Sequence, residues 1–195
     1  MRCMFHLSTN SVAGRGKKNE DYYGSKSFEN AVLIAVADGM GGTDCAKEAA
    51  ELAVNTILNS FVTETPATEA LEQVVLSANE MIADECNKRG CRMGCAIAVV
   101  YIQNDRLYYV SLGNVHIDIL INDSEERVNR DDVYTASNGN CFLTRSISGK
   151  DLEGKVQVKE KSLLGISVIS LSTDGWYNHD EEDDATNVTI TIDRC

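Results

Sequence analysis

The sequence predicts an α+β fold in which antiparallel β-sheets pack against a small group of helices. Three observations support this prediction. Residues 31–37 (AVLIAVA) are continuously apolar and end at a glycine-rich turn, which indicates a fully buried strand. Two later segments repeat apolar residues at helical spacing, and most of the remaining chain consists of short apolar or alternating runs. This order is typical of sheets with helices segregated on them.

Two amphipathic helices are expected in the first half of the chain. The apolar residues of the first run from Ala46 to Leu58, and those of the second run from Leu71 to Ala83. The second helix should end near Gly90, because glycine readily adopts the backbone conformation of a helix C-cap. The polar stretch around Pro66 is expected to connect the two helices.

Strands are expected on both sides of the helices. Residues 95–102, 106–112 and 116–121 are joined by short turns and predict an antiparallel meander. Further strands are expected at residues 3–7, 162–172 and 187–192. No internal repeat or low-complexity segment interrupts the pattern, so residues 1–195 are interpreted as a single domain.

Composition narrows the possible partners. The net charge of −12 disfavours nucleic acid as a partner, because phosphate backbones attract basic surfaces. The apolar runs are far shorter than a membrane span, and no signal peptide is evident, so a cytoplasmic, monomeric protein without a membrane partner is expected. The seven cysteines lack zinc-site spacing, and most of them are expected to be buried, reduced side chains. The excess of acidic over basic residues indicates either a solvated acidic surface or carboxylates that converge on cations.

Carboxylates recur at predicted strand ends and in loops. Asp38 and Asp174 each follow an apolar run and precede a glycine. Other acidic residues lie in the loop before the first sheet and just before the last strand, at Glu20, Asp21, Asp183 and Asp184. Taken singly, each Asp-Gly pair is most simply a turn. Together, rigidly held carboxylates could bind Mg²⁺ or Mn²⁺, which prefer oxygen ligands.

The order of these motifs resembles that of the metal-dependent, type 2C serine/threonine protein phosphatases (the PPM family). The most specific element is VADGMGG at residues 36–42 after Asn19-Glu20-Asp21, in a form common among bacterial members. The other matching motifs are Met93-Gly94-Cys95, Leu143-Thr144-Arg145, Ser172-Thr173-Asp174-Gly175 and Asp183-Asp184-Ala185-Thr186. The resemblance covers nearly the whole chain.

The resemblance implies a sandwich of two antiparallel sheets flanked by helices, in α-β-β-α layers, with a metal cleft at one end. It implies that Asp38 bridges two Mg²⁺ or Mn²⁺ ions and that Glu20 holds one of them. Asp174, Asp183 and the carbonyl of Gly39 would hold the other, and Asp21 would hydrogen-bond metal-bound water. Asp38 and Asp174 would then be catalytic in the hydrolysis of phosphoserine and phosphothreonine in phosphorylated proteins.

Several positions depart from the family pattern. Gly16 stands where the family usually has a phosphate-binding Arg, so either Arg15 or Lys17 is expected to bind phosphate instead. Asn114 replaces an Asp that helps hold a third metal, so a third ion is not expected. The interval from Asp174 to Asp183 is too short for the helices that family members carry there, and a tight loop is expected. Asp184 remains an alternative to Asp183 as ligand.

Two other interpretations follow from the same residues. The chain could be a phosphatase-like binding or regulatory module with weak or no catalysis, as the changes at Gly16 and Asn114 suggest. Residues 39–42 could also form a nucleotide-phosphate loop, but they lack the Lys-Ser/Thr ending that a P-loop requires.

Overall fold

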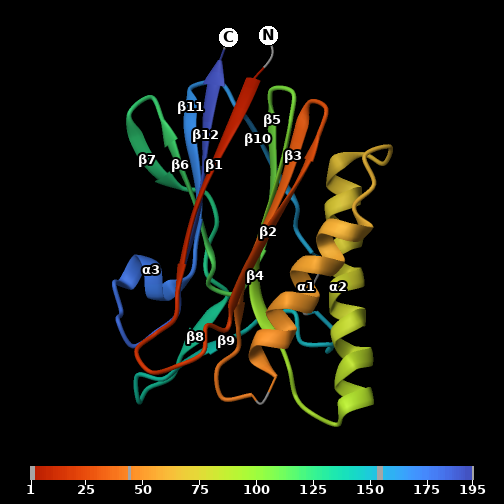
Figure 1. Ribbon diagram of the computed structural model, residues 1–195, viewed down its shortest axis with the longest axis vertical. Coiled ribbons are helices and arrows are strands. Elements are labelled where there is room, and N and C mark those ends of the chain that lie inside the picture. The colour runs from red at the N-terminus through yellow and green to blue at the C-terminus, as the bar shows by residue number, and fades with distance from the viewer. Residues whose placement is uncertain (1–2, 44, 153–155, 195) are drawn as a thin grey trace.

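The computed structural model describes residues 3–43, 45–152 and 156–194. Two five-stranded antiparallel sheets face each other (Figure 1). One, the helix-backed sheet, has the order β10 (Lys159–Ser162), β5 (Arg106–Leu112), β4 (Cys95–Gln103), β3 (Ala31–Gly39), β2 (Asp21–Phe28). The other, the outer sheet, has the order β1 (Cys3–Val12), β12 (Ala185–Arg194), β11 (Ile166–Ser172), β6 (His116–Ile121), β7 (Ser124–Arg127). A separate hairpin pairs β8 (Val133–Thr135) with β9 (Cys141–Leu143).

The central strands of the helix-backed sheet are buried on both faces, as the continuous apolar run at residues 31–37 predicts. On β3, Leu33 and Ala35 face the helices, whereas Val32 and Ile34 face the outer sheet. Because successive side chains of a strand point to opposite faces, an uninterrupted apolar run supplies both layers of the core. The chain thus has one apolar layer under the helices and a second between the sheets.

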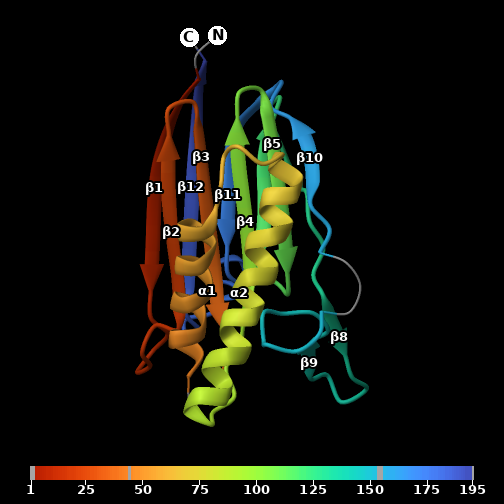
Figure 2. The same ribbon diagram turned by 90° about the vertical axis from the view of Figure 1, so that its right-hand side faces the viewer.

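The helices α1 (Ala46–Ser60) and α2 (Ala67–Arg89) lie side by side across the helix-backed sheet (Figure 2). Small side chains such as Ala49, Ala50 and Ala53 face inward from α1 and are fully buried. Gly90 ends α2 with φ of 66° and donates its N–H to the carbonyl of Cys86, which confirms the expected C-cap. None of the helices in the described residues combines the length and apolar character that a membrane span requires.

The outer sheet has a different character, because its strands alternate. Along β12, Val188 and Ile190 point into the core between the sheets, whereas Thr189 and Thr191 point away from it. Thr189 pairs with Ser8 on one side and with Ser170 on the other, so the outward face is polar. A sheet with one polar face can remain in water and needs no helix to cover it.

The α+β sandwich is confirmed, and its helices are distributed unequally. In the part of the chain that the structure describes, the side of the outer sheet away from the core carries only the five-residue α3 (Asp174–Asn178) (Figure 1). The second helical layer that the resemblance implies is thus reduced to this one short helix. The physical reasons are the short interval between Asp174 and Asp183 and the polar outward face of the sheet.

The predicted meander is wrong in its third strand. β4 and β5 pair as expected, but β6 belongs to the outer sheet, where it pairs with β11 and β7. The crossing occurs at Gly113, whose φ of 97° is accessible to glycine and strained for other residues. Ile117 and Ile119 of β6 pack into the core between the sheets from the outer sheet. Burial of these apolar side chains stabilises the position of β6.

Candidate metal centre

A cleft of about 310 Å³ lies at one end of the sandwich, where four acidic segments meet. These segments are the loop before β2, the end of β3, the start of α3 and the loop before β12. The β8–β9 hairpin contributes Val133, Phe142 and Leu143 to its wall. The predicted residues Glu20, Asp38, Gly39, Asp174 and Asp183 all line this cleft.

Asp38 lies near the end of β3, directly opposite Asp21 of β2. Burial raises the pKa of Asp38 well above its usual range, and the neighbouring carboxylates of Asp21 and Asp174 raise it further. A carboxylate in this position is therefore costly to ionise unless a cation is near. The strand register, rather than a flexible loop, fixes the distance between the two aspartates.

Asp21 is 4% exposed and is held from the opposite sheet. The hydroxyl of Thr173 donates a hydrogen bond of 2.9 Å to Asp21 Oδ2. Among the described residues nothing bonds to the buried Oδ1 atom. Burial raises the pKa of Asp21 to about 7, and the nearby hydroxyls of Thr186 and Thr173 only partly offset this increase. An unpaired buried oxygen beside Asp38 is a position where a bound water would find an acceptor.

The two adjacent aspartates before β12, Asp183 and Asp184, have different surroundings. Asp184 is buried, and its two carboxylate oxygens accept N–H bonds from Gly14 at 2.7 Å and from Glu20 at 2.6 Å. Asp184 thereby fastens the loop before β2 to the loop before β12. Asp183 is less buried and accepts the N–H of Asp184 at 3.0 Å. Burial and the nearby charge of Asp174 raise the pKa of Asp183.

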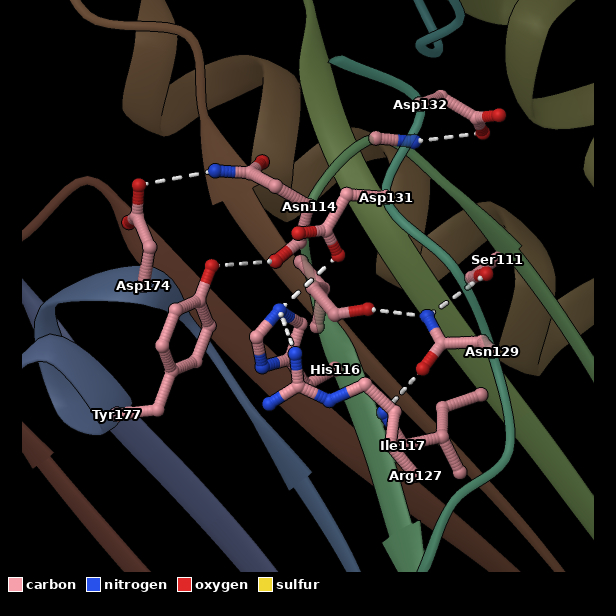
Figure 3. A network of polar contacts seen from close by, with 12 residues as sticks. Ser111, Asn114, His116, Ile117, Arg127, Asn129, Asp131, Asp132, Asp174 and Tyr177 are labelled. Atoms are coloured by element: carbon pink, nitrogen blue, oxygen red, sulfur yellow. Dashed lines mark hydrogen bonds and ion pairs between the residues drawn. The ribbon is translucent and has the colours of Figure 1, made fainter.

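Asp174 begins α3 and accepts a 2.9 Å hydrogen bond from the side-chain amide of Asn114 (Figure 3). The hydroxyl of Tyr177, one turn further along α3, donates to the backbone carbonyl of Asn114 at 3.2 Å. The ring of His116 stacks on Tyr177 with centroids 3.5 Å apart. Sequence analysis singled out Asn114 only as a departure, and it gave Tyr177 no role. Asn114, in the β5–β6 connection, holds the Asp174 carboxylate, and Tyr177 fastens α3 to the same connection.

Gly39 is required by its surroundings. A Cβ atom at this position would lie 2.5 Å from the backbone oxygen of Ala46 and 2.9 Å from that of Glu20. The backbone after Asp38 therefore passes directly between the start of α1 and the loop before β2. Neither neighbour is a flexible side chain, so only glycine fits here without displacing the backbone.

The two candidate phosphate-binding residues, Lys17 and Arg15, have different positions relative to the cleft. Lys17 lines the cleft. Burial and the charge of Asp184 raise the pKa of Glu20, and the positive charge of Lys17 partly opposes this increase. The guanidinium of Arg15 instead forms ion pairs with the acidic loop before β12, with Glu181 and, at 3.2 Å, with Glu182. Lys17 therefore lies at the cleft, and Arg15 lies beside it.

The donor set of the cleft suits a hard cation. Its lining includes five carboxylates and one lysine, which leaves an excess of four negative charges if all are ionised. No three His, Cys, Asp or Glu side chains among the described residues converge closely enough to form a finished metal site. Oxygen donors of this kind are those that Mg²⁺ and Mn²⁺ prefer.

The raised pKa of Asp21 predicts an unusual pH dependence in EDTA. Between about pH 4 and pH 7 the folded protein binds a proton at Asp21 that the unfolded chain releases. Stability of the metal-free protein should therefore fall as pH rises, with a melting temperature higher at pH 5.5 than at pH 7.5. Thermal unfolding in EDTA measures this, and Asp21→Asn should flatten the difference. An equal pH slope in both proteins would contradict the assignment to Asp21.

Comparison with known proteins agrees with this architecture. Residues 10–191 match the family model described as "Protein phosphatase 2C". The chain belongs to the protein phosphatase 2C family. A comparison with curated proteins found no matching sequence.

Similar solved structures show the same fold at low sequence identity. The Mycobacterium tuberculosis serine/threonine phosphatase PstP/Ppp has a TM-score of 0.80 at 16% identity, over 97% of this chain and 99% of that one. Serine/threonine phosphatase Stp1 from Staphylococcus aureus has a TM-score of 0.85 at 15% identity, over 98% and 96%. A PstP catalytic domain in complex with two manganese ions has a TM-score of 0.80 at 18% identity, over 98% and 100%.

Proposed function

We propose that the protein hydrolyses phosphoserine and phosphothreonine in proteins with two Mg²⁺ or Mn²⁺ ions. The observation that carries the proposal is the convergence of carboxylates from four chain segments on one cleft that contains a single lysine. Membership of the protein phosphatase 2C family supports the reaction class. The two manganese ions named for the PstP catalytic domain support the proposed metal content.

The proposed roles of the side chains are those that the resemblance implies, and the residues that line the cleft support them. Asp38 would bridge the two ions, Glu20 would hold one, and the other would be held by Asp174, Asp183 and the Gly39 carbonyl. Asp183 is preferred to Asp184, because both carboxylate oxygens of Asp184 already accept backbone N–H bonds. Bound Mg²⁺ or Mn²⁺ supplies charge for the phosphoryl oxygens and lowers the pKa of water toward neutrality.

The other side chains orient the reactants. Asp21 would accept a hydrogen bond from water through its unpaired Oδ1 atom. Asn114 would hold the Asp174 carboxylate in place through its amide. Lys17 would attract the anionic phosphate group to a cleft that is otherwise acidic. Phe142, which is 56% exposed on the β8–β9 hairpin, offers an apolar surface to the protein chain around the phosphorylated residue.

Metal-dependent hydrolysis is the direct test. The rates on p-nitrophenyl phosphate and on a phosphothreonine peptide should rise at least about 100-fold when Mn²⁺ replaces EDTA. Calorimetric titration should find two ions per chain. A protein that binds Mn²⁺ without hydrolysing either substrate would instead be the phosphatase-like binding or regulatory module. That second candidate gains support from the amide of Asn114, which occupies an oxygen of Asp174.

Lys17→Gln should weaken substrate capture. We expect KM for the phosphopeptide to rise about tenfold with kcat little changed, because a charge-assisted contact to phosphate contributes about 1.5–3 kcal/mol. Arg15→Gln is the matched control, since Arg15 pairs with Glu181 and Glu182 beside the cleft. Steady-state kinetics at fixed Mn²⁺ distinguishes the two. An increase in KM for Arg15→Gln alone would reassign phosphate binding to Arg15.

A further inference from the structure

Two cysteine thiols lie next to each other beside the acidic cleft. Cys45 directly precedes α1, and Cys91 lies in the connection between α2 and β4. Their sulfur atoms are 2.6 Å apart, which is about 0.5 Å longer than a disulfide bond of about 2.05 Å. Both thiols are free and half-buried. The pair is outside the set of residues that the proposed hydrolysis uses.

The surroundings of the pair allow access to a small oxidant. Cys91 lines a surface hollow of about 470 Å³ that extends to Met40 and Gly41, the residues that follow the Asp38-Gly39 turn. Cys86 lines the same hollow, but its thiol points to the carbonyl of Met93, 3.9 Å away. Cys45 is therefore the thiol that the geometry pairs with Cys91.

We propose that Cys45 and Cys91 form an oxidisable dithiol that closes to a reversible intramolecular disulfide when the protein meets hydrogen peroxide. In the first step a thiolate sulfur attacks one peroxide oxygen, the O–O bond breaks, and a sulfenic acid and water form. In the second step the other thiol sulfur attacks the sulfenyl sulfur, the S–O bond breaks, and a second water leaves. The two thiols together lose two electrons, and hydrogen peroxide is reduced to two waters.

The bond would clamp the segment that carries the backbone next to Asp38. The N–H of Met40 already donates to the carbonyl of Gly94 at 2.9 Å, so Met40 is fastened near the start of β4. A Cys45–Cys91 bond would fasten Cys45 to the same connection. Because the sulfurs need to approach by only about 0.5 Å, we expect the cleft to keep its shape on oxidation.

Oxidation should therefore stabilise the protein without inactivating it. A disulfide between residues 45 and 91 closes a long loop in the unfolded chain, which reduces the conformational entropy gained on unfolding. We expect the melting temperature to rise by about 5–10 °C and to return to its original value in dithiothreitol. Any phosphatase activity should change by less than about twofold, and this proposal does not depend on the protein having that activity.

The reaction should also depend on pH. The hydrogen bond with Cys91 and burial raise the pKa of Cys45 to about 11. Because the thiolate is the reactive form, we expect oxidation of the pair to be slow at pH 7 and faster at pH 9.

The test uses the whole chain treated with hydrogen peroxide under denaturant-free conditions. Intact mass should show the loss of two hydrogen atoms, and peptide mapping without reductant should find a fragment that links Cys45 to Cys91. Cys45→Ser and Cys91→Ser should each abolish the fragment and the rise in melting temperature. Cys141→Ser is the matched control, because Cys141 is exposed on β9, and it should retain both.

Three results would overturn the proposal. The first is a fragment that links Cys91 to Cys86. The second is conversion of Cys45 or Cys91 to sulfinic acid without any link. The third is a link between two copies of the chain, which non-reducing electrophoresis would detect as a dimer. Each of these can be observed whether or not the protein hydrolyses phosphate esters, so failure here is distinguishable from failure of the proposed function.

Discussion

Asp38→Asn should abolish metal-dependent hydrolysis, with a loss of at least about 10³-fold in kcat/KM. The asparagine keeps the size of the side chain and removes the charge that would bridge two cations. Calorimetry should detect weaker Mn²⁺ binding and fewer than two sites. Activity on p-nitrophenyl phosphate is the simplest measurement, because this small substrate needs no contact with the β8–β9 hairpin.

The same substitution should stabilise the protein in EDTA. Burial and the charges of Asp21 and Asp174 raise the pKa of Asp38, so its ionised form is unfavourable in the folded, metal-free state. A higher melting temperature in EDTA, together with lost activity, excludes misfolding as the cause. Asp105→Asn, in the exposed turn between β4 and β5, is the control and should leave both properties unchanged. Full activity in Asp38→Asn would refute the proposed centre.

Gly39→Ala should strongly destabilise the fold at the cleft. The new Cβ would meet backbone oxygens of Ala46 and Glu20 at 2.5 and 2.9 Å, so the start of α1 or the loop before β2 must move. Overpacking of this kind costs about 3 kcal/mol. We expect a lower free energy of unfolding in urea, and weaker Mn²⁺ binding because Glu20 is displaced.

Gly41→Ala is the matched control two residues further along the chain. A Cβ atom at Gly41 would have no heavy atom within 4 Å. It adds the same methyl group to the same glycine-rich segment, so it should leave stability and metal binding unchanged. Equal stability of the Gly39→Ala and Gly41→Ala proteins would show that the backbone at residue 39 is less constrained than the packing indicates.

The elements with a strong apolar pattern could be predicted from the sequence. The strands β5 and β6 match their predicted residues, and β3 and β4 extend the predicted ranges by one or two residues. The strand β2 was missed, because its sequence DYYGSKSF lacks both an apolar run and clear alternation. It is stabilised by its register with β3, which sequence periodicity does not reveal.

Short polar strands were missed for a similar reason. The hairpin of β8 and β9, which forms one wall of the cleft, lies between the strands predicted at residues 116–121 and 162–172, where no strand was predicted. The predicted strand at 162–172 is divided into β10 and β11, which belong to different sheets, with Gly165 between them at φ of 82°. Assignment of a strand to one sheet or the other depends on tertiary packing, so alternation alone could not supply it.

The acidic residues that line the cleft are all among those that the sequence singles out, because each lies at a strand end or beside a turn, and their roles as metal ligands stay predictions. Their supporting contacts were not. Thr173 holds Asp21 from the opposite sheet, and Asn114 holds Asp174 across 60 residues of sequence. Such contacts depend on which strands become neighbours, and in this fold the order of strands in space differs from their order along the chain.

The pairing of β1 with β12 has a consequence for how the protein is made. Ten residue pairs join these two strands, from Cys3 with Arg194 to Val12 with Ala185, and β1 is the edge of its sheet with no other neighbour among the described strands. The strand β1 therefore leaves the ribosome long before its pairing partner β12 is made. During synthesis the helix-backed half can assemble early, whereas closure of the outer sheet follows only after residue 194 has emerged.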